Sequence, residues 1–116
     1  MSEADCLFCK IVSKEIPAKI VYEDDRTLAF RDVNPQAPTH VLVVPREHYP
    51  NAAALAAADH GLADDVLKAA HAVAEQEGIA DSGYRLVFNT GPGAGQTVFH
   101  VHGHVLGGRG LTWPPG

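Results

Sequence analysis

The chain has 116 residues, of which 46% are apolar, and its formal net charge is −5. This length is typical of one domain with a core of its own. No apolar run approaches the roughly eighteen residues of a membrane span, and no basic cluster favours nucleic acid as a partner. The N-terminal sequence MSEADCLFCK lacks the long apolar stretch of a secretory signal, so we expect a cytoplasmic protein.

The apolar pattern and the chain breakers predict a mixed helix and strand protein. In chain order we expect a short helix over 6–14, strands at 20–23 and 27–32 that form a hairpin, a strand at 40–44, a helix over 59–77, and strands at 84–89 and 99–106. Asp59 is the candidate cap of the long helix and Gly78 its terminator. This order favours an α+β fold, an antiparallel sheet of about five strands with the long helix on one face.

Three histidines alternate in FHVHGHVL, near the C-terminal end of the chain. His100, His102 and His104 lie two residues apart among Val, Phe and Leu, which favour strands. Side chains at this spacing project from one face of a strand, about 6.6 Å apart per step. We therefore expect the three imidazoles to be neighbours.

Three interpretations fit this row of imidazoles. The first takes them as solvated or hydrogen-bonded side chains on a polar sheet face. The second takes them as ligands of a catalytic zinc ion, since His-x-His on a strand suits a tetrahedral metal. The third takes one imidazole as a nucleophile, because a pKa of about 6.5 leaves most of it neutral at pH 7.

The surrounding sequence resembles the histidine-triad (HIT) superfamily. HVHGHVLGGR matches its signature of histidines alternating with apolar residues, and both KEIPAKIVYEDDRTLAFRDVNPQAPTHVLVVP and the terminal WPPG are similar to Hint-type nucleotide phosphoramidases. The resemblance covers nearly the whole chain and implies a single HIT domain over residues 1–116. Gly103 stands where the signature usually has a bulky apolar residue, so we expect looser packing there.

The resemblance implies catalytic roles for three histidines. His102 would attack the α-phosphorus of a purine nucleoside 5′-phosphoramidate, and water would then release the nucleoside monophosphate from the nucleotidyl-histidine. His104 would hydrogen-bond the phosphate or the leaving group, and His40 would join the histidine network as an outer member. The alternatives are a dinucleoside polyphosphate hydrolase, which uses the same attack, and a non-catalytic, zinc-stabilised nucleotide-binding module.

A glycine-rich segment precedes the histidine row and is a candidate phosphate cradle, because glycines let backbone N–H groups approach a ligand closely. The resemblance implies that its phosphate contacts are Asn89, Gly95, Gln96 and Thr97. It also makes Asp32 the acceptor for the ribose diol, although Asp32 taken alone reads as a turn residue. The residues expected to border the base are Phe8, Ile11, Phe30 and Val33.

Two cysteines, Cys6 and Cys9, have the spacing C-x-x-C. This spacing indicates a redox pair, half of a zinc site or two reduced buried thiols. Histidine-triad branches that carry C-x-x-C imply a structural zinc ion with two histidines as further ligands, here His48 and His100. His100 would then lie outside the proton network.

The resemblance also implies a homodimer in which the C-terminal segment, with Trp113, reaches toward the partner's active site. Two histidines on the expected long helix, His60 and His71, are predicted to be exposed.

Overall fold

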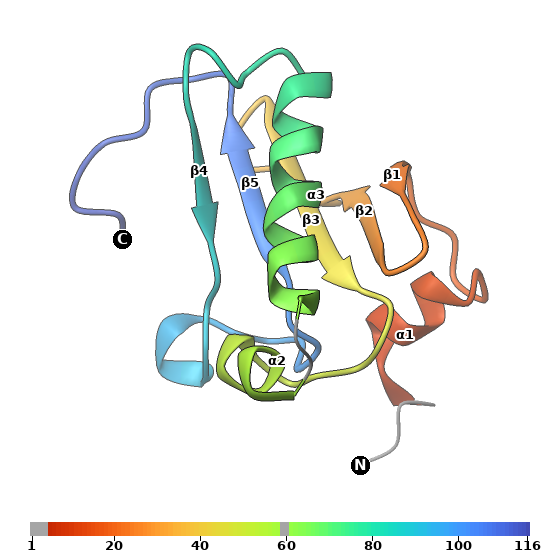
Figure 1. Cartoon of the computed structure of the whole chain (residues 1–116). Coiled ribbons are helices and arrows are strands. Elements are labelled where there is room, and N and C mark those ends of the chain that lie inside the picture. Colours follow the sequence, from red (N-terminus) through yellow and green to blue (C-terminus); the bar gives the residue numbers. More distant parts are fainter. Residues whose placement is uncertain (1–4, 59–60) are drawn as a thin grey trace.

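Five antiparallel strands form one sheet in the computed structural model, which describes residues 5–58 and 61–116. The strands are β1 (Ile20–Glu23), β2 (Thr27–Arg31), β3 (Thr39–Pro45), β4 (Tyr84–Val87) and β5 (Gly103–Gly107), in the order β1-β2-β3-β5-β4 (Figure 1). The helices are α1 (Leu7–Val12), α2 (Ala52–Ala58) and α3 (Leu62–Gln76), with a short 3₁₀ turn, η2, at Pro92–Ala94. The predicted α+β fold with a five-stranded antiparallel sheet is confirmed.

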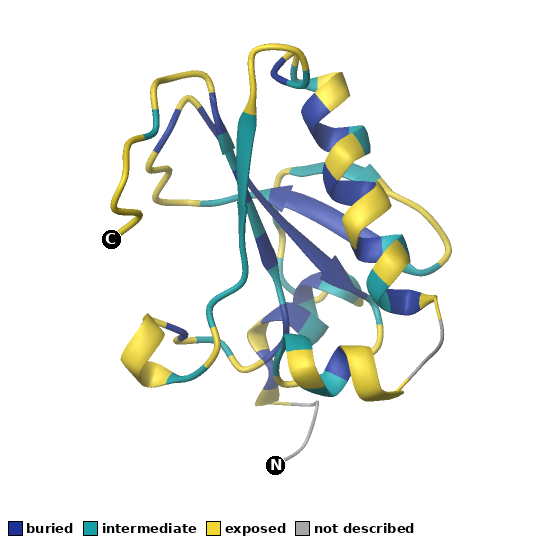
Figure 2. Cartoon of the chain, turned by 60° about the vertical axis from the view of Figure 1, so that its left-hand side comes forward, coloured by how far each residue is buried: buried dark blue, intermediate teal, exposed yellow. Residues whose placement is uncertain are grey.

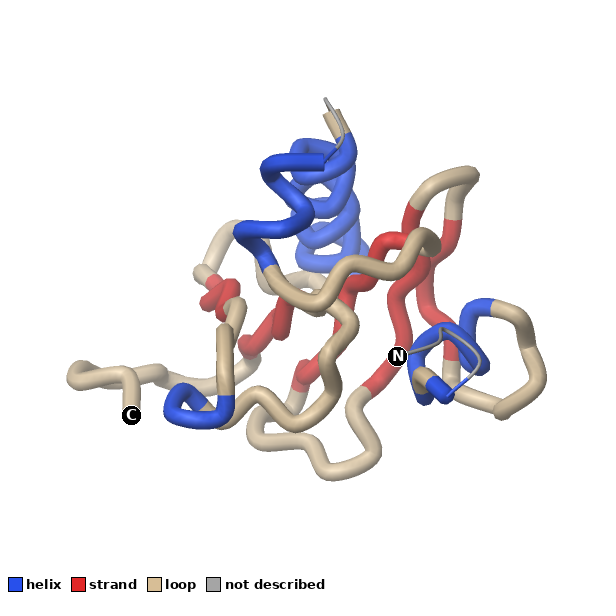
Figure 3. The backbone as a smooth tube through the Cα atoms, turned by 90° about the horizontal axis from the view of Figure 1, so that it is seen from below, coloured by secondary structure: helices blue, strands red, loops and turns tan. Residues whose placement is uncertain are grey.

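The long helix α3 covers one face of the sheet, as predicted. Its buried side chains, which include Val66, Ala70 and Val73, pack in one cluster with Ala29 of β2 and Val41 of β3. Figure 3 shows α2 and α3 together on one side of the sheet, with α1 apart from them. The apolar stripe of α3 at helical spacing therefore meets the inward side chains of the strands.

The short helix α1 packs on a second cluster, formed by the alternate side chains of the same strands. Phe8 and Ile11 lie against Leu28, Phe30 and Leu42. Every residue of β3 is buried, because the strand lies mid-sheet and has packed side chains on both faces (Figure 2). This explains why its sequence reads as an apolar run rather than an alternation.

The predicted helix over 59–77 corresponds to α3, which begins at Leu62, three residues after the predicted start. A separate helix, α2, which was not predicted, comes before α3, and Gly61 is the N-cap of α3 with a φ of +91°. The sequence AAALAAA of α2 gave no signal, because alanine carries too little contrast to define an apolar face. The candidate cap Asp59, like His60, lies outside the described residues. The predicted end is confirmed, since α3 stops at Gln76 and Gly78 has a φ of +75°.

The histidine row is not one strand, which corrects the prediction for residues 99–106. The strand β5 begins only at Gly103, so His104 lies in it while His100 and His102 precede it. The amide of Val101 donates to the carbonyl oxygen of Tyr49 at 2.7 Å, outside the sheet ladder. The other strand predictions hold to within two residues at each end.

Gly103 is tightly packed, which corrects the expectation of looser packing. A Cβ placed there would lie 2.7 Å from Cζ of Phe88 and 3.1 Å from Cδ1 of Leu86. The Phe88 ring therefore fills the space that a bulky residue at position 103 would take. The missing volume is supplied from another segment.

No helix within residues 5–58 and 61–116 has the length and apolar character that crossing a membrane requires.

His71 is exposed on α3, as predicted, and Trp113 is 80% exposed.

Candidate active site

His102 has its tautomer set by a backbone carbonyl. Its Nδ1 lies 2.8 Å from the carbonyl oxygen of His100, and a carbonyl oxygen only accepts hydrogen bonds. Nδ1 therefore carries the proton, and Nε2 keeps the lone pair. The ring of Phe8 meets the imidazole edge to face, with centroids 5.0 Å apart and planes at 87°. These two contacts fix which nitrogen of His102 can act as a nucleophile and how the ring is oriented.

A chain of hydrogen bonds sets the tautomers of His40 and His104. The backbone N–H of Gln36 donates to Nδ1 of His40 at 3.0 Å. The proton of neutral His40 is therefore on Nε2, which lies 2.9 Å from Nδ1 of His104 and donates to it. Neutral His104 then carries its proton on Nε2. Its ring centroid lies 5.0 Å from that of His102, so this N–H is a donor beside the His102 ring.

Asp32 completes the group around His40. Its Oδ2 lies 3.4 Å from Nε2 of His40, and its Oδ1 accepts the backbone N–H of Asn34 at 2.8 Å. Asp32, His40 and His104 have donor atoms close enough for a divalent metal. A metal on Nε2 of His40 would move the ring proton to Nδ1, against the N–H of Gln36 that already donates there. The arrangement therefore favours a shared proton over a metal.

Burial keeps these imidazoles neutral. It lowers the pKa of His104 to about 4, and the neighbouring rings of His102 and His40 add to the effect. Burial also lowers the pKa of His102 and of His40, although the charge of Asp32 opposes the shift in both. Neutral rings at pH 7 supply the lone pair that a nucleophile requires.

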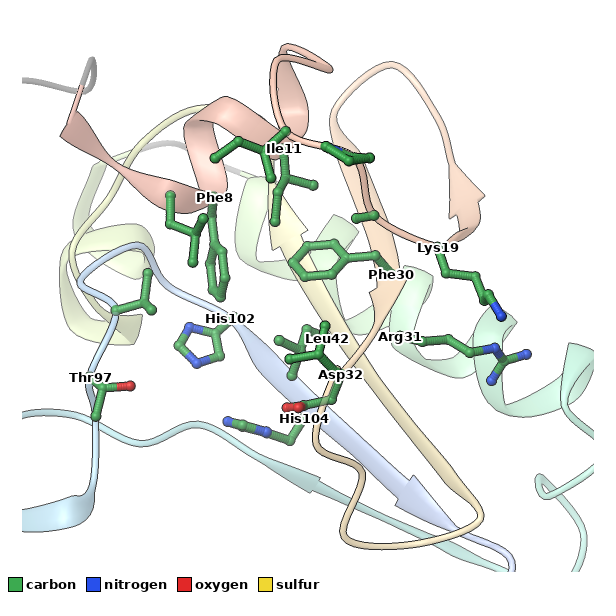
Figure 4. A pocket seen from close by; sticks show the side chains of 16 residues that line it. Phe8, Ile11, Lys19, Phe30, Arg31, Asp32, Leu42, Thr97, His102 and His104 are labelled. Atoms are coloured by element: carbon green, nitrogen blue, oxygen red, sulfur yellow. The ribbon is translucent and has the colours of Figure 1, made fainter.

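A cavity of about 610 Å³ lies between α1, β2 and the histidines (Figure 4). On one side Phe8 and Phe30 meet edge to face, with centroids 5.3 Å apart, and Ile11 and Leu42 extend this apolar wall. The other side carries the polar groups Asp32, Thr97, His102 and His104. This division suits a ligand with a flat, weakly polar ring at one end and a charged group at the other.

Four residues behind His102 form a cluster of metal-ligand type. The donor atoms of Cys6, Cys9, His48 and His100 all lie within 4.8 Å of one another. Nε2 of His100 donates to the carbonyl oxygen of Pro45 at 2.9 Å, so the lone pair on Nδ1 faces the sulfurs of Cys6 at 3.4 Å and Cys9 at 3.5 Å. Two thiols and two imidazoles fit tetrahedral zinc, and the carbonyl of Pro45 is a typical orienting partner for a ligating histidine.

Residues 13–111 match the family described as HIT domain. The chain belongs to the HIT family. Its members share the fold, and a solved HIT family hydrolase from Legionella pneumophila Philadelphia 1 superimposes with a TM-score of 0.92. That protein is 51% identical, and the match covers 97% of this chain and 100% of the other.

Two curated HIT relatives carry more specific names. A 14 kDa zinc-binding protein of Zea mays is 47% identical, over 100% of this chain and 91% of its own. Adenylylsulfatase HINT1 of Arabidopsis thaliana is 45% identical, over 99% of this chain and 79% of its own. Both matches extend over nearly the whole of this chain.

The cavity of this HIT protein brings together residues predicted from four separate segments of the chain. The predicted nucleotide contacts that line it are Phe8, Ile11, Phe30, Asp32, Val33, Thr97, His102 and His104. Asn89 and Gly95 do not line it, although they belong to the loop that leads to Thr97. Gln96 does not line it either; its side chain is buried and bonds to backbone groups.

Further lining residues were not predicted from the sequence. They are Leu7, Ile16, Pro17, Ala18, Lys19, Arg31, Leu42 and Val98. Leu42 lies two residues after His40 on β3, so strand alternation was a signal that placed both on one face. Residues 16–18 lie in the loop between α1 and β1, where the sequence has no helical or strand periodicity. Only the packing of α1 therefore reveals that they reach the cavity.

Proposed function

We propose that this HIT protein hydrolyses purine nucleoside 5′-phosphoramidates through a covalent nucleotidyl-histidine at His102. One observation carries the proposal: the carbonyl of His100 holds the proton on Nδ1 of His102, which leaves the Nε2 lone pair of a half-buried, neutral imidazole at the cavity wall. The name of the solved Legionella relative, a HIT family hydrolase, supports hydrolysis as the reaction class.

The proposed reaction has two displacements at phosphorus. In the first, Nε2 of His102 forms a bond to the α-phosphorus, the phosphorus–nitrogen bond to the amine breaks, and the amine leaves with the proton from Nε2 of His104. In the second, water attacks the same phosphorus and gives a proton to Nε2 of His104, the bond to His102 breaks, and the nucleoside monophosphate is released. Two smaller barriers replace one large barrier, which is the general advantage of covalent catalysis.

The other polar groups would stabilise these steps. The Nε2–H of His104 would donate to a phosphoryl oxygen or to the leaving nitrogen, and the bond from His40 holds it in that tautomer. Asp32, at the polar side of the cavity, would accept the ribose hydroxyls, while Phe8 and Phe30 would border the base. The name of the Arabidopsis relative, an adenylylsulfatase, supports an adenylyl group as the part that binds.

Rapid quench with an adenosine phosphoramidate tests the proposal. We expect a transient mass gain of one adenylyl group on His102 and release of AMP. His102→Ala should abolish turnover while AMP still binds, because the apolar wall and Asp32 remain. His71→Ala, on the exposed face of α3, is the matched control and should retain full activity.

Two results would reject the mechanism. One is an unmodified His102 during turnover, and the other is turnover that persists in His102→Ala. AMP binding without any phosphorus chemistry would instead indicate the non-catalytic nucleotide-binding module. A dinucleoside polyphosphate would react by the same attack, so relative rates on the two substrates decide between these substrate classes.

We also propose that Cys6, Cys9, His48 and His100 hold a structural zinc ion. Four protein ligands complete a tetrahedral site, so no position is left for a reacting water. The zinc-binding name of the Zea mays relative supports the metal. Burial lowers the pKa of His100 to about 4, so this imidazole is neutral, as a metal ligand must be.

A further inference from the structure

The side chain of Gln96 is buried and fully engaged with the backbone. It is 4% exposed. Its Oε1 accepts the N–H of Gly91 at 2.8 Å, and its Nε2 donates to the carbonyl oxygens of Pro50 at 2.7 Å and Val98 at 3.1 Å. Both protons of the amide are therefore used, so the side chain has no donor left for a ligand.

These bonds join three segments beside the cavity. Gly91 begins the glycine-rich loop, and the backbone N–H of Gln96 also bonds to its carbonyl oxygen at 3.0 Å, so the loop is closed twice. Pro50 follows Tyr49, whose carbonyl oxygen holds the amide of Val101 next to the nucleophile. One side chain thus links the loop, the connection after β3 and the approach to the histidine row.

Thr97 is the residue that these bonds enclose. It lies between Gln96 and Val98, and the bond from Gln96 to the carbonyl of Val98 spans it. Thr97 and Val98 both line the cavity, and Figure 4 shows Thr97 beside His102 on the polar side. Thr97 is itself exposed, so it has little packing of its own to fix its position.

We propose that Gln96 is a positioning residue that holds Thr97 in place for the phosphoryl group and does not contact the nucleotide. The inference rests on the proposed function of the cavity. Donors that act on developing charge must be placed within a fraction of an ångström, and a misplacement of about 1 Å can cost roughly 100-fold in rate. The three hydrogen bonds from the Gln96 side chain to the backbone supply such placement.

Gln96→Leu removes all three bonds while keeping an apolar side chain of similar size. We expect kcat for an adenosine phosphoramidate to fall by roughly 10- to 100-fold, with the Kd for AMP changed by less than about threefold. In the ligand-free protein, hydrogen exchange at the Gly91 amide should become at least about tenfold faster, because its acceptor is gone. The double variant Gln96→Leu/Thr97→Val should be hardly slower than the slower single variant, since both changes remove the same positioned group.

Gln76→Leu is the matched control. Nε2 of Gln76 donates to the carbonyl oxygen of Val21 at 2.7 Å, the same kind of bond on the other side of the molecule, so its loss should leave kcat and Gly91 exchange as in the wild type. If Gln96→Leu does not fold, the shorter variant Gln96→Asn serves instead. It should show a smaller decrease in kcat and a smaller increase in the exchange rate of the Gly91 amide.

Three outcomes would overturn the inference: wild-type kcat in Gln96→Leu, unchanged exchange at Gly91, or an AMP affinity that falls as much as kcat/KM. The last would make Gln96 a direct ligand. Failure of the proposed function has a different signature, in which the wild type itself does not turn over. The exchange measurement on ligand-free protein then still tests whether the Gln96 side chain holds the loop through the Gly91 amide.

Discussion

At the scale of single residues, backbone groups decide where the protons lie. The carbonyl of His100 and the N–H of Gln36 are the two backbone groups that fix the tautomers of His102 and His40, and His40 in turn fixes His104. The residue types of this network were predictable from the spacing and the family resemblance. The tautomers were not, because they depend on which backbone group each ring nitrogen meets after folding.

The low pKa of His104 predicts a pH dependence of stability. Its pKa is about 4 in the folded protein and about 6.5 in the unfolded chain. Above pH 6.5 both states are neutral at this group, but between pH 6.5 and 4 the unfolded chain binds the proton and the folded protein does not. The free energy of unfolding should therefore decrease as the pH falls through this window.

The variant His104→Asn removes this contribution. The dependence of the free energy of unfolding on pH between 6.5 and 4, measured by denaturant titration, should become flatter by on the order of 1–2 kcal/mol over the window. This size allows for solvent screening of a partly exposed ring. An equal slope in the variant and the wild type would show that His104 titrates normally when folded.

At the scale of elements, the histidine row combines two kinds of backbone. Strand alternation explains His104, which lies on β5 opposite Leu42 of β3. The segment before Gly103 is held instead by contacts of single residues, among them the bond from Val101 to Tyr49. Local sequence could not show this change, because Val, which favours strands, alternates with histidine in both halves of the row.

Gly103 on β5 gives a prediction about packing. An added Cβ would lie 2.7 Å from the Phe88 ring, so Gly103→Ala should lower the free energy of unfolding by about 1–3 kcal/mol. The second change Phe88→Leu should restore part of the loss, because the shorter side chain vacates the space. Gly110→Ala, where nothing lies within 4 Å, is the control in the same denaturant unfolding experiment. A Gly103→Ala protein as stable as this control would contradict the packing argument.

At the scale of the whole molecule, the metal-type cluster joins segments that are distant in the chain. Cys6 and Cys9 belong to the start of α1, His48 to the connection after β3, and His100 to the histidine row. The cluster therefore connects α1, which contributes to the apolar wall of the cavity, to the backbone that carries His102. The homodimer, the single domain over 1–116 and the cytoplasmic location stay predictions.

Removal of the metal should lower stability. A ligand that binds only the folded state adds its binding free energy to folding, so chelation should reduce the melting temperature markedly. We expect about one zinc per chain by elemental analysis, and the loss of zinc in Cys9→Ser but not in His102→Ala. Equal melting temperatures with and without the metal would count against a structural role.

The sequence by itself determined the family, the order of most elements and the residues that we propose carry the chemistry. These follow from local patterns: the alternation in strands, the apolar stripe of α3 and the spacing of the histidines and cysteines. Only the tertiary structure decided that the row of histidines is divided between two clusters, that Phe88 fills the space at Gly103 and that Gln96 bonds to the backbone. The physical reason is that each of these depends on atoms far apart in the chain, whose distances no local pattern records.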